Sequence, residues 1–167
     1  MIREISRLLR PGGLVLLIEP SLHPFAEGDR PTPEAGASHV PTNSGWSSFW
    51  ETYRACLTRQ GIDISIPERL AEILLATGTF EDVIQRDGNI PVGFWPNDPN
   101  LLTVGQLQWM DFDLFLPAVR PLLLSLGLGE RHVLELIANA QKDLYHPPVE
   151  GLGCRVHIVH ASKKMSS

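Results

Sequence analysis

The chain has 167 residues, 43% of them hydrophobic and 20% charged, with a formal net charge of -5 and an isoelectric point near 5.6. This length suits one domain with a substantial core and is short for two. The acidic balance argues against a nucleic-acid-binding surface, which would carry clustered lysine and arginine. No segment approaches the ~20 apolar residues that a membrane-spanning helix needs. We therefore expect neither nucleic acid nor a membrane among its partners.

The cysteines and the N-terminal stretch indicate the compartment. Cys56 and Cys154 are too few for a disulfide framework or a metal site, and we expect both to be reduced and buried. The apolar stretch Leu14 to Ile18 is too short for a secretion signal, and Glu19 ends it. The sequence thus predicts a cytoplasmic or nuclear location.

The first twenty residues predict a helix, a tight turn and a strand. Apolar residues recur at helical spacing over residues 1–9, and Pro11-Gly12-Gly13 then forbids continuation of the helix. Residues 14–18 are wholly apolar, so we expect both faces of this strand to be buried, as in a parallel sheet covered by helices. Such a strand also needs a hydrogen-bonded neighbour along each edge.

Three further segments follow from composition and periodicity. Residues 20–44 are rich in proline, glycine, serine and threonine and predict a long loop, which in a compact domain is either mobile or a functional lid. Residues 45–78 predict a helical cap, with aromatic residues at helical spacing from Trp46 onward and Ser44 or its neighbour as the N-cap. Residues 80–92 predict either one bulged strand or two short pieces, since an Asp-Gly pair and a proline interrupt them.

The C-terminal part predicts helices followed by a strand. Residues 94–148 predict a helical insertion, in which Thr103 and Gln106 have the spacing of a capping box. Residues 153–163 alternate in the manner of a strand and predict the last one.

Few residue patterns point to chemistry, and no catalytic residue can be assigned. No glycine-rich loop follows a strand and opens a helix, and the six histidines lack metal-ligand spacing. We therefore expect no metal. Ligands of open α/β sheets bind beyond the carboxyl ends of strands, where Glu19 is predicted to lie. With His23 in the following loop, Glu19 can orient a substrate or act as a base; the alternative is that it only ends the strand.

Trp46, Trp50 and Tyr53 share one face of a predicted helix and are candidates for the wall of an aromatic substrate pocket. An aromatic stripe at helical spacing is more often core packing. The two interpretations are compatible if the helix covers the strand ends and one side of the stripe faces a cavity.

The order of elements resembles a known enzyme family. Glu4–Glu19 resembles the helix, Leu-(Lys/Arg)-Pro-Gly-Gly turn and fifth strand of class I S-adenosylmethionine-dependent methyltransferases, and Leu74–Val83 resembles the helix and sixth strand. Pro91–Asp98, the helical insertion and Val156–Val159 followed by two lysines are similar to fungal methyltransferases of secondary metabolism.

The resemblance implies an α/β fold in which residues 1–167 form the C-terminal part of a Rossmann-like methyltransferase domain, with strands five to seven and a helical insertion. The family's cofactor-binding half is absent from these residues, so no cofactor-binding residue is identifiable. S-adenosyl-L-methionine is implied for the complete domain, and we expect none to bind this chain alone. In the family, the fifth strand pairs with the fourth and the seventh; without the fourth, residues 14–18 offer an apolar edge for self-association.

The function implied by the resemblance is that of part of a methyltransferase acting on a small-molecule substrate and inactive alone. The alternative is a non-catalytic interaction module that pairs through the exposed strand edge or the aromatic helix.

Overall fold

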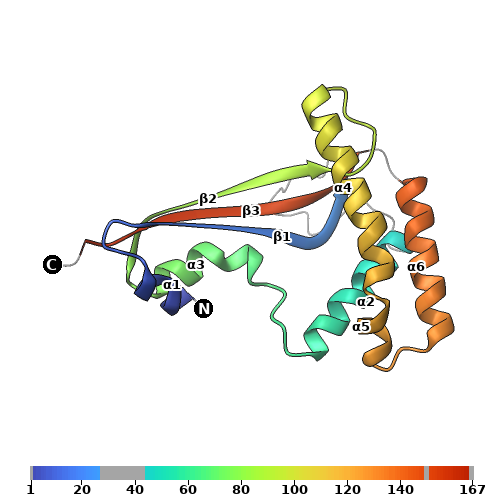
Figure 1. Cartoon of the computed structure of the whole chain (residues 1–167), viewed down its shortest axis with the longest axis horizontal. Coiled ribbons are helices and arrows are strands. Elements are labelled where there is room, and N and C mark those ends of the chain that lie inside the picture. Colours follow the sequence, from blue (N-terminus) through green and yellow to red (C-terminus); the bar gives the residue numbers. More distant parts are fainter. Residues whose placement is uncertain (1, 27–43, 149–150, 166–167) are drawn as a thin grey trace, which may run out of the picture. The chain divides into compact units, whose positions relative to one another are not determined.

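A computed structural model describes residues 2–26, 44–148 and 151–165, which form an α/β fold (Figure 1). The chain divides into two compact units. Unit 1 contains residues 1–21, 65–88 and 155–167, and unit 2 contains residues 22–64 and 89–154. Each unit has its own hydrophobic core, and each of the three strands has residues in both units.

The sheet has the strand order β1-β3-β2, formed by β1 (Leu14–Ala26), β2 (Phe80–Pro91) and β3 (Leu152–Lys163). β3 runs antiparallel to both neighbours, which replaces the parallel arrangement expected around the first strand (Figure 1). The expected pairing of the first strand with the last is confirmed. β2 is one continuous strand, the first of the two alternatives, and Asp82 within it has a φ of 52°.

β1 differs from its prediction in length and in burial. The strand continues past Glu19 to Ala26, so residues 20–26 are not part of a loop, and residues 27–43 lie outside the described residues. Only one face of β1 is covered: Val15 is 6% exposed, whereas alternate side chains are open to solvent (Leu14 62%, Leu16 54%, Ile18 55%). Among the described residues, the edge of β1 that faces away from β3 has no strand partner.

The covered face of unit 1 packs against two short helices, α1 (Ile2–Leu8) and α3 (Leu70–Ala76), the latter preceded by the 3-10 turn η1 (Pro67–Arg69). Both helices lie on the same side of the sheet (Figure 1). The buried side chains of this core come from α3 and from the sheet face that the two helices cover: Val15, Leu70, Leu74, Phe80, Val159 and Ala161.

Two consecutive lysines at the end of β3 stabilise these helices. The Lys163 ammonium donates to the carbonyl oxygens of Ser6 and Leu9, at 2.7 Å each, and the Lys164 ammonium donates to the carbonyl of Gly78 at 2.8 Å. Carbonyls at a helix C-terminus lack intrahelical partners, and the helix dipole favours cations there. The end of β3 therefore holds the C-termini of both α1 and α3.

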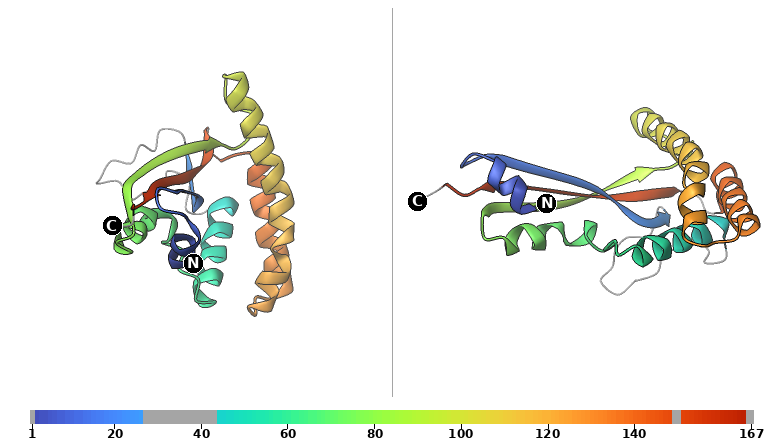
Figure 2. Two further views of the ribbon diagram at one scale, coloured as in Figure 1. Left: turned by 60° about the vertical axis from the view of Figure 1, so that its left-hand side comes forward. Right: turned by 60° about the horizontal axis from the view of Figure 1, so that its bottom comes forward.

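Unit 2 is built mainly from α2 (Gly45–Arg59), α4 (Pro99–Ala118), α5 (Arg120–Ser125) and α6 (Glu130–Tyr145). α4 and α6 run side by side in both views of Figure 2. None of the helices in the described part of the chain is long and apolar enough to cross a membrane.

The start of α2 is fixed against α6. Ser44 is the N-cap, and its hydroxyl accepts from the amide of Ser47 at 3.0 Å. The amide of Trp46 donates to the Asp143 carboxylate at 2.9 Å. At Gly45 a Cβ would lie 2.5 Å from the backbone of Asn139, so the close approach of the two helices requires glycine.

α4 begins earlier than the predicted capping box. Asp98 is the N-cap, and its Oδ1 accepts from the amides of Asn100 and Leu101 at 2.9 Å each, with Pro99 in the first turn. Thr103 lies inside the helix, where its hydroxyl donates to the carbonyl of Pro99 at 2.9 Å. The predicted cap at Thr103 is therefore wrong.

The assignment of the α4 N-cap to Asp98 and not to Thr103 can be tested by mutation. We expect Asp98→Ala to lower the free energy of unfolding by about 1 kcal/mol, because two backbone donors lose their acceptor. Thr103→Ala is the matched control and should change stability by less than about 0.5 kcal/mol, since alanine favours a helix interior. Urea denaturation followed by circular dichroism distinguishes the two; a larger loss for Thr103→Ala would contradict the assigned cap.

Candidate functional site

Glu19 does not lie at the end of its strand. It is an exposed residue within β1, which continues to Ala26, so the premise that placed Glu19 beyond the carboxyl end of the strand is wrong. His23 is also exposed and lies further along the same strand, not in a loop. Glu19 belongs to unit 1 and His23 to unit 2. Whether either residue contacts a substrate stays a prediction.

The aromatic residues of α2 lie in the core of unit 2. Trp46 is 1% exposed and Trp50 6%, and their ring centroids are 5.7 Å apart in an edge-to-face arrangement. Phe112 and Phe115 of α4 contact this cluster, and Tyr53 is half-buried at its margin. This burial favours the packing interpretation of the stripe.

The indole N–H groups of Trp46 and Trp50 are buried and have no hydrogen-bond partner among the described residues. A buried donor without an acceptor costs roughly 1–3 kcal/mol. Both rings are therefore held by apolar and ring contacts alone.

One interaction connects the segments that carry His23 and Tyr53. The Arg54 guanidinium of α2 donates to the carbonyl of Leu22 at 3.0 Å. Burial lowers the pKa of Arg54, and the nearby Glu51 carboxylate opposes this effect. The bond places the later part of β1 against α2. Of the predicted site residues, His23, the neighbour of Leu22, therefore lies near α2, which carries Trp46, Trp50 and Tyr53.

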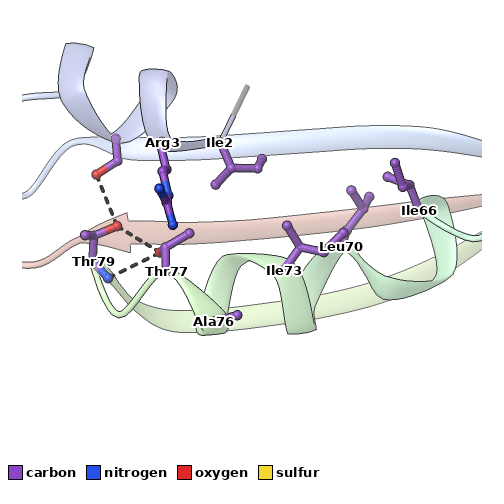
Figure 3. Close-up of a pocket in the computed structure, with 9 residues that line it drawn as sticks. Ile2, Arg3, Ile66, Leu70, Ile73, Ala76, Thr77 and Thr79 are labelled. Carbon is purple, nitrogen blue, oxygen red and sulfur yellow. Dashed lines mark hydrogen bonds between the residues drawn. The ribbon is translucent and has the colours of Figure 1, made fainter. Parts of the chain in front are cut away.

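A pocket of about 810 Å³ lies between α1 and α3 in unit 1 (Figure 3). Its wall is largely aliphatic, with Ile2 on α1 facing Leu70 and Ile73 on α3. At one end the Ser6 hydroxyl donates to Thr79 Oγ1 at 3.1 Å, and the hydroxyls of Thr79 and Thr77 are 2.9 Å apart. The hydroxyls thus bond to one another and leave the pocket mainly apolar.

A second pocket, of about 460 Å³, lies in unit 2 and has aromatic walls. Phe94 and Trp95 follow β2, Trp109 is on α4, and Tyr145 ends α6. The indole of Trp95 donates to the carbonyl of Leu152 at 3.0 Å, and that of Trp109 donates to the carbonyl of Leu144 at 3.1 Å. The sequence patterns predicted neither pocket; the Phe94-Trp95 pair before the helical insertion was the available signal for this one.

The amides of the glycine turn before β1 are engaged in backbone hydrogen bonds. Gly12 N–H donates to the carbonyl of Lys163 and Gly13 N–H to that of Arg10, each at 2.9 Å. No group of three or more histidine, cysteine, aspartate or glutamate side chains among the described residues can hold a metal ion.

The comparisons agree with the family expected from the sequence. The chain is 32% identical over 147 residues to the secondary metabolism regulator laeA of the fungus Coprinopsis cinerea. The resemblance is confirmed at the level of the family. The match covers 87% of this chain but only 35% of the relative's length. No family model matches the chain.

The burial of the Cys154 thiol predicts how the stability of the fold depends on pH. Cys154 is 8% exposed; burial raises the pKa of its thiol to about 11, and the Asp111 carboxylate adds to this effect. The folded protein thus holds this proton more tightly than the unfolded chain does. The resulting stability is complete below about pH 9 and is lost as the pH rises from 9 towards 11.

We expect Cys154 to react with a thiol reagent at pH 8 only after unfolding in urea. A Cys56→Ala variant leaves Cys154 as the single thiol, and colorimetric titration with and without urea measures its access. Rapid reaction in the folded protein at pH 8 would contradict the assigned burial.

Proposed function

We propose that this chain supplies the C-terminal strands and the helical insertion of a methyltransferase-like protein of secondary metabolism. The complete protein uses S-adenosyl-L-methionine to methylate a small molecule, and the chain alone does not transfer methyl groups. The observations that carry this proposal are the open apolar face of β1 and its outer edge, which no strand of the described residues pairs with, in a chain that matches about a third of a longer relative.

The open face is larger than a set of scattered surface residues. Leu14, Leu16 and Ile18 are each more than half exposed on β1, and Ile84 of β2 is 43% exposed. Ile158 of β3 has the opposite parity to the buried Val159 and therefore also lies on the open face. Burying such side chains stabilises by about 1.5–3 kcal/mol each, which favours a covering layer supplied by the rest of the protein.

Methyl transfer requires mainly that the accepting atom be held in line with the cofactor's methyl group. Glu19 and His23, both exposed on β1, are the residues proposed to contact the substrate, each within its own unit. The cofactor's own contacts come from residues outside this chain.

The proposal is tested with a chimera in which these residues replace the matched segment of the Coprinopsis relative. We expect the chimera and the unaltered relative to bind S-adenosyl-L-methionine with similar affinity in calorimetry, and the isolated chain not to bind it. Transfer of a labelled methyl group to a cell extract then tests activity.

Leu16→Asp in the chimera should reduce binding at least about tenfold, because it places a charge under the covering layer. Glu72→Lys, on the exposed surface of α3, is the control and should leave binding unchanged. Cofactor binding by the isolated chain, or by the Leu16→Asp chimera at full affinity, would overturn the proposal.

The second candidate is an interaction module, favoured by the same edge of β1. Pairing of two copies along residues 14–18 would satisfy backbone groups that no described strand pairs with and would bring the exposed apolar side chains of the two copies side by side. The aromatic stripe of α2 offers no comparable surface, because Trp46, Phe49 and Trp50 are buried.

Light scattering distinguishes this candidate. A self-associating chain should give a mass near twice the monomer value, and Leu16→Lys should restore the monomer by placing a charge on the edge strand. Leu75→Lys changes an equally exposed leucine on α3, 59% exposed, and should leave the dimer intact. A monomer at all concentrations excludes the module.

A further inference from the structure

We propose that the aromatic pocket of unit 2 binds a small organic cation of the quaternary ammonium class. The pocket lies entirely within residues 92–151 and involves no methyl transfer, so this site does not depend on the proposed function.

The walls of the pocket include three aromatic rings in edge-to-face contact, which we call the cage. Trp109 stands between two other rings: the centroid of Phe94 is 5.6 Å away at an interplanar angle of 64°, and that of Tyr145 is 5.0 Å away at 82°. Steeply inclined rings around one recess present their faces or edges from different directions. Aromatic faces attract cations through the ring quadrupole, and methylated ammonium groups are the ligands that such cages bind.

The cage is preorganised. The indole donors of Trp95 and Trp109 are both bonded to backbone carbonyls, which fixes the two ring orientations. The amide of Gly93 donates to the carbonyl of Gly105 at 2.9 Å, and a Cβ at Gly105 would lie 2.5 Å from the Gly93 oxygen. This contact of two glycine backbones holds the turn that carries Phe94 against α4. A rigid site loses little conformational entropy on binding.

The charge around the pocket favours a cation. None of the nine lining residues is charged, so the charge comes from the surroundings. The Tyr145 hydroxyl donates to the Asp113 carboxylate at 3.1 Å, which places a negative charge at the rim. The same bond raises the pKa of Tyr145.

The pocket also lies at the C-terminus of α6, where Leu144 and Tyr145 are the last helical residues. The helix dipole carries a partial negative charge at this end. Lys142, in the last turn of α6, is the nearest cation along the helix and is not among the lining residues. Together, these features favour a cation over a neutral ligand of the same size. They are the aromatic walls, the carboxylate at the rim and the C-terminus of α6.

The test compares choline with its neutral isostere 3,3-dimethylbutan-1-ol, in which carbon replaces the charged nitrogen. Two-dimensional NMR of the full chain resolves the indole N–H signals. We expect choline to shift the signals of Trp95 and Trp109 and not those of Trp46 and Trp50, with sodium chloride at equal ionic strength as the blank. Choline should bind about two- to fivefold more tightly than the alcohol, or better, as expected for cation–π contacts.

Phe94 supplies the matched variants, since it is 62% exposed and its replacement leaves the core intact. Phe94→Leu should weaken choline binding about two- to fivefold by removing one ring, whereas Phe94→Tyr should retain it. Equal affinity for choline and the alcohol, or shifts that persist unchanged in Phe94→Leu, would overturn the assignment. The absence of any shift at Trp95 and Trp109 would do the same.

Discussion

Both described strand pairings depend on β3. The order β1-β3-β2 means that β1 and β2 never pair with each other, so the last strand of the chain satisfies the backbone groups of both. At its end, Lys163 and Lys164 also reach the C-termini of α1 and α3. β3, the central strand, therefore organises the sheet and the two helices that cover it. The apolar β1 is held by this single antiparallel neighbour among the described strands.

Local signals predicted the elements that are themselves local. Helical spacing and the Pro-Gly-Gly turn identified α1, α2 and the start of β1 because each depends on residues within a few positions. The extent of β1 was missed because Pro20 and its polar neighbours are typical of loops. An edge strand tolerates proline, and among the described residues no strand pairs with the outer edge of β1. The position of β1 at the edge follows from pairing, which no local pattern contains.

The candidate site shows the same division. The spacing of Trp46, Trp50 and Tyr53 is compatible with a pocket or with a core, and the rings of α4 decide for burial. Glu19 was placed at a strand end because the strand was predicted too short. The two pockets combine residues from segments far apart in the sequence, such as Ile2 with Ile73 and Phe94 with Tyr145, so composition could not reveal them.

The pairing of β1 with β3 has a consequence for synthesis. The bond from Gly12 to Lys163 joins residues 151 positions apart (163 - 12 = 151). Chains with such high contact order fold slowly, and the N-terminal part leaves the ribosome first. The edge of β1 that pairs with β3 therefore stays unpaired until nearly all of these residues have been translated. Over that interval the nascent chain exposes an apolar strand, which makes it a natural client for chaperones.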